Sequence, residues 1–403
     1  MTLHVLPDGT ITSPRGFAAG ATHAGIKAIG ERPLDLGLLV SDTPCDVAGT
    51  FTTNLVQAPP LVLTRERVAK GRAQALVVNS GNANAFTGDE GMRDAEEMTA
   101  LTAARLGLPV DSVLVASTGV IGAPLPMALV RSGIEALQAS PTGGHGLAQA
   151  ITTTDTFPKE RAVSVTVDGR QVTIAGIAKG AGMVHPNMAT LLAFLTTDAA
   201  VEPSFLRQAL HRAVDGSFNM VTIDGDTSTN DMVLLFANGV AGNDPLTEGH
   251  PAAVDFLTAL EDVCRYLAVC IARDGEGATR LLTIEVTGAL SEEDARRAAR
   301  TVAGSMLVKS AVHGADPNWG RLIAALGRSG AQVVPEKIGL FLDTIPLVRQ
   351  GRPLPFDHDD ARQHMLGREV LFRLELGLGE GQATAWGCDL SEEYVTFNSA
   401  YTT

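Results

Sequence analysis

The sequence predicts a mixed α/β protein in which helices and strands alternate along the whole chain. Short aliphatic runs such as 74–79 (QALVVN) and 112–116 (SVLVA) are separated by segments with helical spacing of Met, Ala and Leu, such as 92–106 and 126–140. Hydrophobic residues make up 45% of the chain and aromatic residues only 4%, so Ala, Val, Leu and Ile must build the core. With 403 residues, the chain exceeds what one hydrophobic core usually serves, which predicts two domains or two closely packed halves.

A β-hairpin is the clearest local element. The runs AVSVTV (162–167) and QVTIAGIA (171–178) alternate apolar and polar residues on either side of Asp168-Gly169. Asp-Gly between two such runs is the strongest short hairpin signal, because both residues tolerate the positive φ angles of the turn. The second arm of this hairpin leads directly into KGAGMVHPNMAT.

The second half of the chain continues the alternation, which favours an α/β or α+β class with mixed sheets. Ser291 is expected to cap a helix, with Asp294 at its third position. The other expected elements are a strand in LLAFLTTDA after Thr190, a helix at 203–214, a strand at 232–237, a helix at about 251–272, and strands in VLFRLELGLG and in the final YVTFNSAYTT.

The bulk properties exclude several classes. A formal net charge of −14 argues against nucleic-acid binding, which needs a basic footprint. The first residues do not resemble a secretory signal, and no apolar run approaches the roughly 20 residues of a membrane helix. The four cysteines are scattered, so we expect buried reduced thiols, which fits a cytoplasmic protein.

Two further motifs fail as functional signals. The run DGDTSTND (224–231) resembles the start of a calcium loop, but it lacks the glycine and the final Glu that such a loop requires. His185 precedes Pro186 and is interpreted as a solvated loop residue, with a catalytic base as the alternative. Neither a metal nor a cofactor is predicted.

The segment KGAGMVHPNMATLL is unusual for a connection between two strands. Gly180 and Gly182 permit positive φ angles, and Pro186 biases His185 away from a helix. We therefore expect a tight, strained connection. Locally, an ordinary β-connection remains the alternative.

The motifs of the chain resemble the ArgJ family, the ornithine acetyltransferases or glutamate N-acetyltransferases of arginine biosynthesis. The family's Lys-Gly-x-Gly-Met and Pro-Asn-Met-Ala-Thr pattern is matched by 179–183 and 186–190. Further matching blocks occur in the family's order along nearly the whole chain: VNSGNANAFTG, ASTGVIG, TTDTFPK, SFNMVTIDGDTSTND, RDGEGATR, VKSAVHGADPNWGR and FNSAYTT.

The resemblance implies a self-cleaving enzyme. The chain would break between Ala189 and Thr190, leaving an alpha chain (1–189) and a beta chain (190–403) whose N-terminal Thr190 is the nucleophile. Thr118 and Gly119 would form the oxyanion hole. The implied fold is the four-layer αββα arrangement of the DmpA and ArgJ type, with two mixed sheets.

The implied reaction moves an acetyl group from N-acetylornithine to glutamate through an acetyl-Thr190 intermediate, without a cofactor. Acetyl-CoA is an additional co-substrate in some family members. The resemblance also implies a cytoplasmic assembly of two alpha and two beta chains. The alternative is a self-processing N-terminal-nucleophile hydrolase or aminopeptidase. Implied substrate contacts are Thr153 or Thr154, Lys179, Thr190, Glu276, Asn398 and Thr403.

Overall fold

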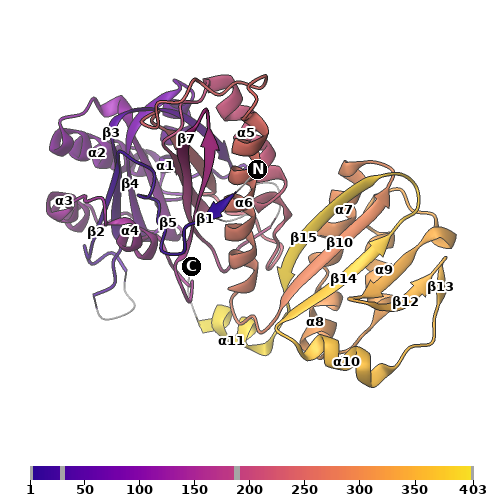
Figure 1. The fold of residues 1–403 in the computed structure, drawn as a ribbon. Helices are drawn as coiled ribbons and strands as arrows, with labels where there is room; N and C mark the ends of the chain where they lie inside the picture. The colour runs from indigo at the N-terminus through magenta and orange to yellow at the C-terminus, as the bar shows by residue number, and fades with distance from the viewer. Residues whose placement is uncertain (1–2, 28–31, 186–190, 401–403) are drawn as a thin grey trace.

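The chain forms two lobes that lie side by side (Figure 1), as seen in a computed structural model that describes residues 3–27, 32–185 and 191–400. The larger, N-terminal lobe contains a nine-stranded sheet, and the C-terminal lobe contains a six-stranded sheet. Both sheets are mixed, because each combines antiparallel pairs with a parallel pair. The predicted mixed α/β class with two mixed sheets is therefore confirmed.

The nine-stranded sheet runs in the order β1-β6-β7-β8-β9-β3-β4-β5, and β2 pairs with β3 beside this path. The long strand β3 pairs with β4 along its first part and with β9 along its last part. Its strands are β1 (His4–Val5), β2 (Phe17–Thr22), β3 (Leu36–Phe51), β4 (Arg72–Asn82), β5 (Val113–Val120), β6 (Lys159–Val167), β7 (Arg170–Lys179), β8 (Leu192–Thr197) and β9 (Met232–Ala237).

The two halves of this sheet pack face to face. One buried cluster joins Leu39, Leu76 and Leu114 of the β3-β4-β5 half to Ile177, Phe194 and Leu234 of the other half. Helices α2 (Gly88–Leu106) and α3 (Met127–Ala136) cover the outer face of the first half, and α5 (Pro203–Asp215) and α6 (Ala253–Arg273) cover the outer face of the second. The αββα layers thus lie within the N-terminal lobe, with α1 (Pro59–Val68) and α4 (Gly144–Ala150) beside them.

The second sheet runs in the order β13-β12-β11-β14-β10-β15. Helix α7 packs on β10 and β15 of this sheet. One face of the sheet is therefore covered by helices of the C-terminal lobe. The elements are β10 (Leu281–Ala289), α7 (Glu292–Ala303), α8 (Met306–His313), α9 (Trp319–Gly327), β11 (Gly339–Leu342), β12 (Ile345–Arg349), β13 (Arg352–Pro353), α10 (His358–Leu366), β14 (Glu369–Glu375) and β15 (Gly381–Cys388).

Most local predictions are confirmed. The hairpin of β6 and β7 turns at Asp168 (φ 50°) and Gly169 (φ 73°), both in the left-handed region that a two-residue turn requires. The Ser291 side chain accepts a hydrogen bond from the Asp294 backbone N–H at 3.1 Å, which caps α7 as expected. The helix predicted at 126–140 ends earlier, at Ala136, because Leu137 is extended.

The strand expected in the final residues is wrong. Residues Glu392–Ala400 form a helix, α11, which returns from the C-terminal lobe towards the N-terminal lobe (Figure 1). The Ser391 hydroxyl accepts from the Tyr394 N–H at 3.3 Å, and Glu392 and Glu393 occupy the first turn, where acidic side chains stabilise a helix. These capping interactions outweigh the strand preference of the β-branched and aromatic residues that follow.

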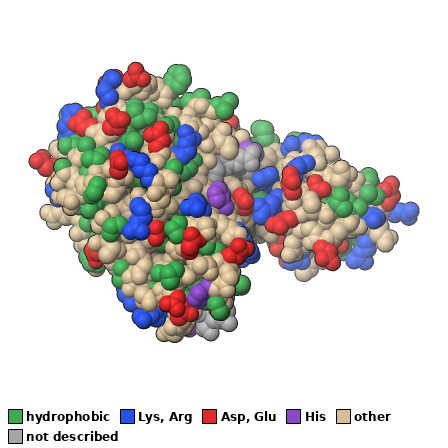
Figure 2. Space-filling view, turned by 90° about the horizontal axis from the view of Figure 1, so that it is seen from above, with side chains coloured by type: hydrophobic (Ala, Val, Ile, Leu, Met, Phe, Trp, Pro, Cys, Tyr) green, Lys and Arg blue, Asp and Glu red, His purple; other side chains and the backbone are tan. Residues whose placement is uncertain are grey.

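On the face seen in Figure 2, acidic and basic side chains are intermingled rather than gathered into one basic area. All four cysteines are buried and unpaired, as predicted. Across the described ranges, no helix is both long and apolar enough to cross a membrane.

Candidate active site

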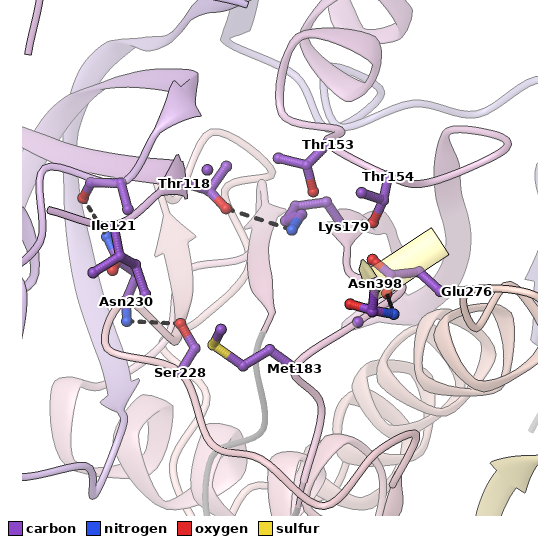
Figure 3. Close-up of a pocket in the computed structure, with 13 residues that line it drawn as sticks. Thr118, Ile121, Thr153, Thr154, Lys179, Met183, Ser228, Asn230, Glu276 and Asn398 are labelled. Atoms are coloured by element: carbon purple, nitrogen blue, oxygen red, sulfur yellow. Dashed lines mark hydrogen bonds between the residues drawn. The ribbon is translucent and has the colours of Figure 1, made fainter. Parts of the chain in front are cut away.

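A pocket opens where β5 and β7 end, and it collects the predicted site residues (Figure 3). All seven of these residues that the structure describes line it, although they come from five separate parts of the chain. Ala189, Thr190 and Thr403 lie outside the described residues. The lining residues are Ala83, Thr118, Gly119, Ile121, Thr153, Thr154, Lys179, Gly182, Met183, Ser228, Asn230, Glu276 and Asn398.

Lys179 ends β7 and is only 4% exposed. Within the described part of the chain, the one hydrogen-bond acceptor of its ammonium is the Thr118 hydroxyl oxygen, at 3.4 Å. Burial lowers the pKa of Lys179 from its ordinary value, while the nearby Asp155 carboxylate acts in the opposite direction. An ammonium carries three donors, so this buried cation has capacity for an anionic ligand in the pocket.

Thr118 and Gly119 lie together at the end of β5. Gly119 has φ +130°, and a Cβ atom there would stand 2.4 Å from the Gly81 carbonyl carbon, so only glycine fits. The Thr118 oxygen accepts from Lys179, which leaves its own O–H available to donate to another acceptor. The pair therefore offers a hydroxyl and a backbone amide, the donor types that form oxyanion holes.

An amide network fixes this strand end. The Asn230 side chain donates to the Ser117 carbonyl at 2.9 Å and to the Ala83 carbonyl at 2.7 Å. The Ser117 hydroxyl in turn donates to Asn79 at 2.6 Å. Asn230 is not among the residues predicted for the site, although it lies in the block SFNMVTIDGDTSTND that resembles the family. The sequence feature that could have identified Asn230 is a run of hydroxyl and amide residues directly before a buried strand.

Glu276 and Asn398 form the opposite wall (Figure 3). The Asn398 side-chain amide donates to Glu276 Oε2 at 2.9 Å, which joins α11 to the loop after α6. The Glu276 backbone N–H donates to the Ala181 carbonyl at 2.8 Å. A Cβ atom on Gly182 would lie 2.5 Å from the Glu276 carboxylate, so this glycine makes room for the acidic side chain.

The Gly182→Ala variant tests this close approach. We expect the added methyl group to displace the Glu276 carboxylate and to weaken substrate binding about tenfold, because a small misplacement at a polar contact is costly. The Gly216→Ala variant is the matched control, since a Cβ there meets nothing nearer than 3.7 Å. KM measured for both variants checks the result, and an unchanged KM in Gly182→Ala contradicts it.

The connection after β7 is strained, as predicted. Gly180 has φ +151° and Met183, which is not a glycine, has φ +56°. The Asp224 carboxylate holds this conformation by accepting from the Met183 N–H at 2.5 Å and the Val184 N–H at 2.9 Å. Burial raises the pKa of Asp224.

His185 lies at the end of this connection and outside the set of pocket-lining residues. Its Nδ1 atom shares a hydrogen bond with the Thr222 hydroxyl at 3.1 Å. Burial and the nearby Arg300 lower the pKa of His185. His185 is therefore a partly buried, hydrogen-bonded loop residue rather than the solvated one expected, and the alternative of a catalytic base gains no support because His185 does not line the pocket.

The chain resumes beside the same pocket. The Leu191 N–H donates to Asp231 Oδ1 at 3.0 Å, and Leu192 pairs with Lys179 as β8 begins. A small adjoining cavity is lined by Leu191, Asp231, Ser228 and Lys179, among others. Leu191 therefore lies beside Thr118 and Lys179. Among the residues that the structure describes, no cluster of His, Cys, Asp or Glu could hold a metal ion.

The fold and this pocket are those of a mixed α/β enzyme, with a buried ammonium and polar donors gathered between two strand ends. The model of the ArgJ family matches residues 18–403, and this chain belongs to the ArgJ family. It is 54% identical to the "Arginine biosynthesis bifunctional protein ArgJ" of Symbiobacterium thermophilum over 98% of this chain and 99% of that protein. It is 50% identical to the protein of the same name from Dehalococcoides mccartyi, over 100% of this chain and 99% of that protein.

A solved structure agrees with this assignment. The crystal structure of the arginine biosynthesis bifunctional protein from Bacillus halodurans is 44% identical in sequence, with a TM-score of 0.51. The match covers 52% of this chain and 98% of that chain.

Proposed function

We propose that this protein transfers an acetyl group from N-acetylornithine to glutamate, giving ornithine and N-acetylglutamate. The observation that carries the proposal is the buried Lys179 ammonium, which has donors to spare beside the Thr118–Gly119 pair. This arrangement suits a substrate with a carboxylate near an acyl group. Membership of the ArgJ family and the names of its close relatives, which assign them to arginine biosynthesis, support the same reaction.

Thr190 is the nucleophile of the proposed reaction, and it becomes an N-terminus when the chain cleaves itself after Ala189. In this step the Thr190 hydroxyl attacks the Ala189 carbonyl, and water then opens the resulting ester. Two features support the proposal: Met183 has a left-handed backbone, and the Asp224 carboxylate holds it by accepting from its N–H. Strain stored in the backbone before the scissile bond would be released on cleavage. The solved relative, whose chain matches about half of this one, has the length that the product 190–403 would have.

The freed α-amino group of Thr190 acts as the general base. An α-amine has a pKa of about 7.7–8.0, so it is partly neutral at working pH and accepts the hydroxyl proton. Attack of Thr190 Oγ on the acetyl carbonyl gives a tetrahedral oxyanion, which the Thr118 O–H and the Gly119 N–H stabilise. The ammonium then returns the proton to the departing ornithine amine. Glutamate then accepts the acetyl group by the reverse of these steps. Its amine attacks the acetyl ester, and Thr190 Oγ is the leaving group.

The residues in the pocket walls bind the substrate in this proposal. Lys179 pairs with the substrate α-carboxylate, while Glu276, held by Asn398, receives the side-chain ammonium of ornithine. Thr153 or Thr154 and Thr403 complete the contacts. We propose no cofactor, although acetyl-CoA is a candidate second donor. The two products are proposed to assemble as two alpha and two beta chains in the cytoplasm.

The rival candidate is an N-terminal-nucleophile hydrolase, in which water instead of glutamate accepts the acetyl group. Ornithine release from N-acetylornithine, measured with and without glutamate, separates the two. We expect release to rise at least about tenfold when glutamate is added, with N-acetylglutamate formed in equal amount, because water is excluded from a closed acyl-enzyme site. Release that is independent of glutamate identifies the hydrolase. Replacing N-acetylornithine by acetyl-CoA in the same assay tests the second donor.

A further inference from the structure

A chain of buried charges lies beneath the pocket and has no part in the reaction proposed above. The Lys159 ammonium donates to Asp155 Oδ1 at 2.6 Å and to Asp274 Oδ2 at 2.5 Å. The side chains of Lys159 and Asp155 are fully buried, and that of Asp274 is 3% exposed. Buried ion pairs seldom add stability over apolar packing. A role other than stability is therefore needed to explain these three buried charged residues.

The Asp155 carboxylate joins two walls of the pocket. Its Oδ2 atom accepts from the backbone N–H of Thr153 at 3.0 Å. Its Oδ1 atom accepts from the backbone N–H of Gly180 at 2.7 Å, directly after Lys179. One carboxylate therefore fixes the distance between a lining threonine and the strand end that carries the lysine.

Asp274 extends the connection to the third wall. Its carboxylate accepts from the backbone N–H of Thr156 at 3.0 Å and from the Thr156 hydroxyl. Asp274 precedes Glu276 by two residues, and Glu276 is tied back to the β7 loop through Ala181. The three charged residues thus connect the backbone segments that carry Thr153, Lys179 and Glu276.

The charges of the buried network alternate in sign. The Lys159 ammonium lies between the Asp155 and Asp274 carboxylates, and Asp155 also acts on the Lys179 ammonium. Burial raises the pKa of Asp155, but Lys159, Lys179 and the Gly180 N–H outweigh burial and bring it to about 2. The charged groups that face Lys179 are Asp155, Lys159, Asp231, Glu276 and, from the N-terminal part of the chain, Lys27.

We propose that Asp155 is a positioning residue of this pocket. It sets the spacing between the Thr153 wall and the Lys179 strand end, and it supplies the negative charge that keeps the Lys179 ammonium protonated for a carboxylate ligand. Without Asp155, the buried Lys179 would lose the carboxylate that acts on it most strongly, while the like charge of Lys159 would remain. The lysine would then lose its proton at a lower pH, because burial and a like charge both disfavour the charged form.

The inference rests on the proposed carboxylate substrate, but it can be tested without turnover. The test is a ¹⁵N NMR titration of lysine-labelled protein, with the Lys179 Nζ signal assigned by its absence in Lys179→Met. We expect Asp155→Asn to lower the pKa of Lys179 by about one unit or more, the usual effect of losing a close opposite charge. The matched control is Asp262→Asn, which removes a carboxylate from a half-buried pair with Arg161.

A kinetic experiment tests whether the Asp155 charge affects the binding of a carboxylate substrate. In Asp155→Asn, kcat/KM for N-acetylornithine should fall about tenfold or more above the new pKa of Lys179, and the alkaline limb of the pH profile should move to lower pH. The α-carboxamide analogue of N-acetylornithine carries no negative charge, so its kcat/KM should change less. A merely structural role would lower both values equally and leave the limb in place.

The outcomes are distinguishable. Wild-type protein that turns over neither substrate overturns the proposed function, while the titration still decides the role of Asp155. An unchanged pKa of Lys179 in Asp155→Asn overturns the inference, whatever the activity. If Asp155→Asn does not fold, the double variant Asp155→Asn/Lys159→Met is titrated instead and compared with Lys159→Met alone, so that both proteins lack the Lys159 charge. The pKa of Lys179 should be lower in the double variant than in Lys159→Met, and equal values contradict the inference.

Discussion

Thr190→Ala should remain a single chain of 42.0 kDa and should have no transferase activity above background. The alanine lacks the oxygen that attacks the Ala189 carbonyl, and without cleavage no α-amine forms to act as the base. Loss of a catalytic nucleophile alone typically removes about 10⁶-fold of kcat. Denaturing mass spectrometry and the ornithine-release assay measure the two effects separately.

Two controls accompany this variant. Thr258→Ala removes a threonine hydroxyl from the exposed side of α6 and should cleave and turn over normally. Thr190→Ser keeps an oxygen nucleophile and should retain partial cleavage. An intact wild-type chain with full activity would contradict self-cleavage, and an active Thr190→Ala would remove Thr190 from the reaction.

Thr118→Val should lower kcat by about 10² to 10³, with a smaller effect on KM. The substitution keeps the shape of the side chain but removes the hydroxyl, and loss of one oxyanion donor raises a barrier by about 2.7–4 kcal/mol. The donor acts mainly on the transition state, so kcat and kcat/KM should fall together. Steady-state kinetics on cleaved protein measure this loss.

The matched control is Thr102→Val in α2. Thr102 is also buried, but its hydroxyl donates only to the Met98 carbonyl within the same helix. We expect its kcat to match wild type. If kcat in Thr118→Val stays within a factor of a few of wild type, then Thr118 is not an oxyanion donor. Because Lys179 donates to Thr118, a change in KM for carboxylate substrates would also report on that contact.

The family motifs predicted which residues gather in one pocket, whereas the strand expected at the C-terminus is a helix. Family motifs identified Lys179, Thr118 and Glu276, which the structure brings to one pocket. Residues 394–400 combine strand-forming residues, yet they form a helix because Ser391 and two glutamates cap its start. The Ser391 cap is the same kind of local signal as the Ser291 cap of α7, so the start of α11 was readable from the sequence.

The supporting residues, in contrast, could not be predicted. Asp155 and Asp274 are more than 100 positions apart, and their common partner Lys159 reads as an ordinary polar residue at the start of a strand. Only the packing of α6 against β6 brings them together and buries them. Asn230 is similar, since its role depends on carbonyl groups of Ala83 and Ser117 that belong to distant segments.

The order of strands in the large sheet determines what cleavage after Ala189 would do to the molecule. Strands β8 and β9 follow the proposed cut, but they lie between β7 and β3, which precede it. The two products would therefore share one continuous hydrogen-bonded sheet with two seams. We expect them to melt in a single transition and to stay together through dilution, so that neither half has a folded state of its own.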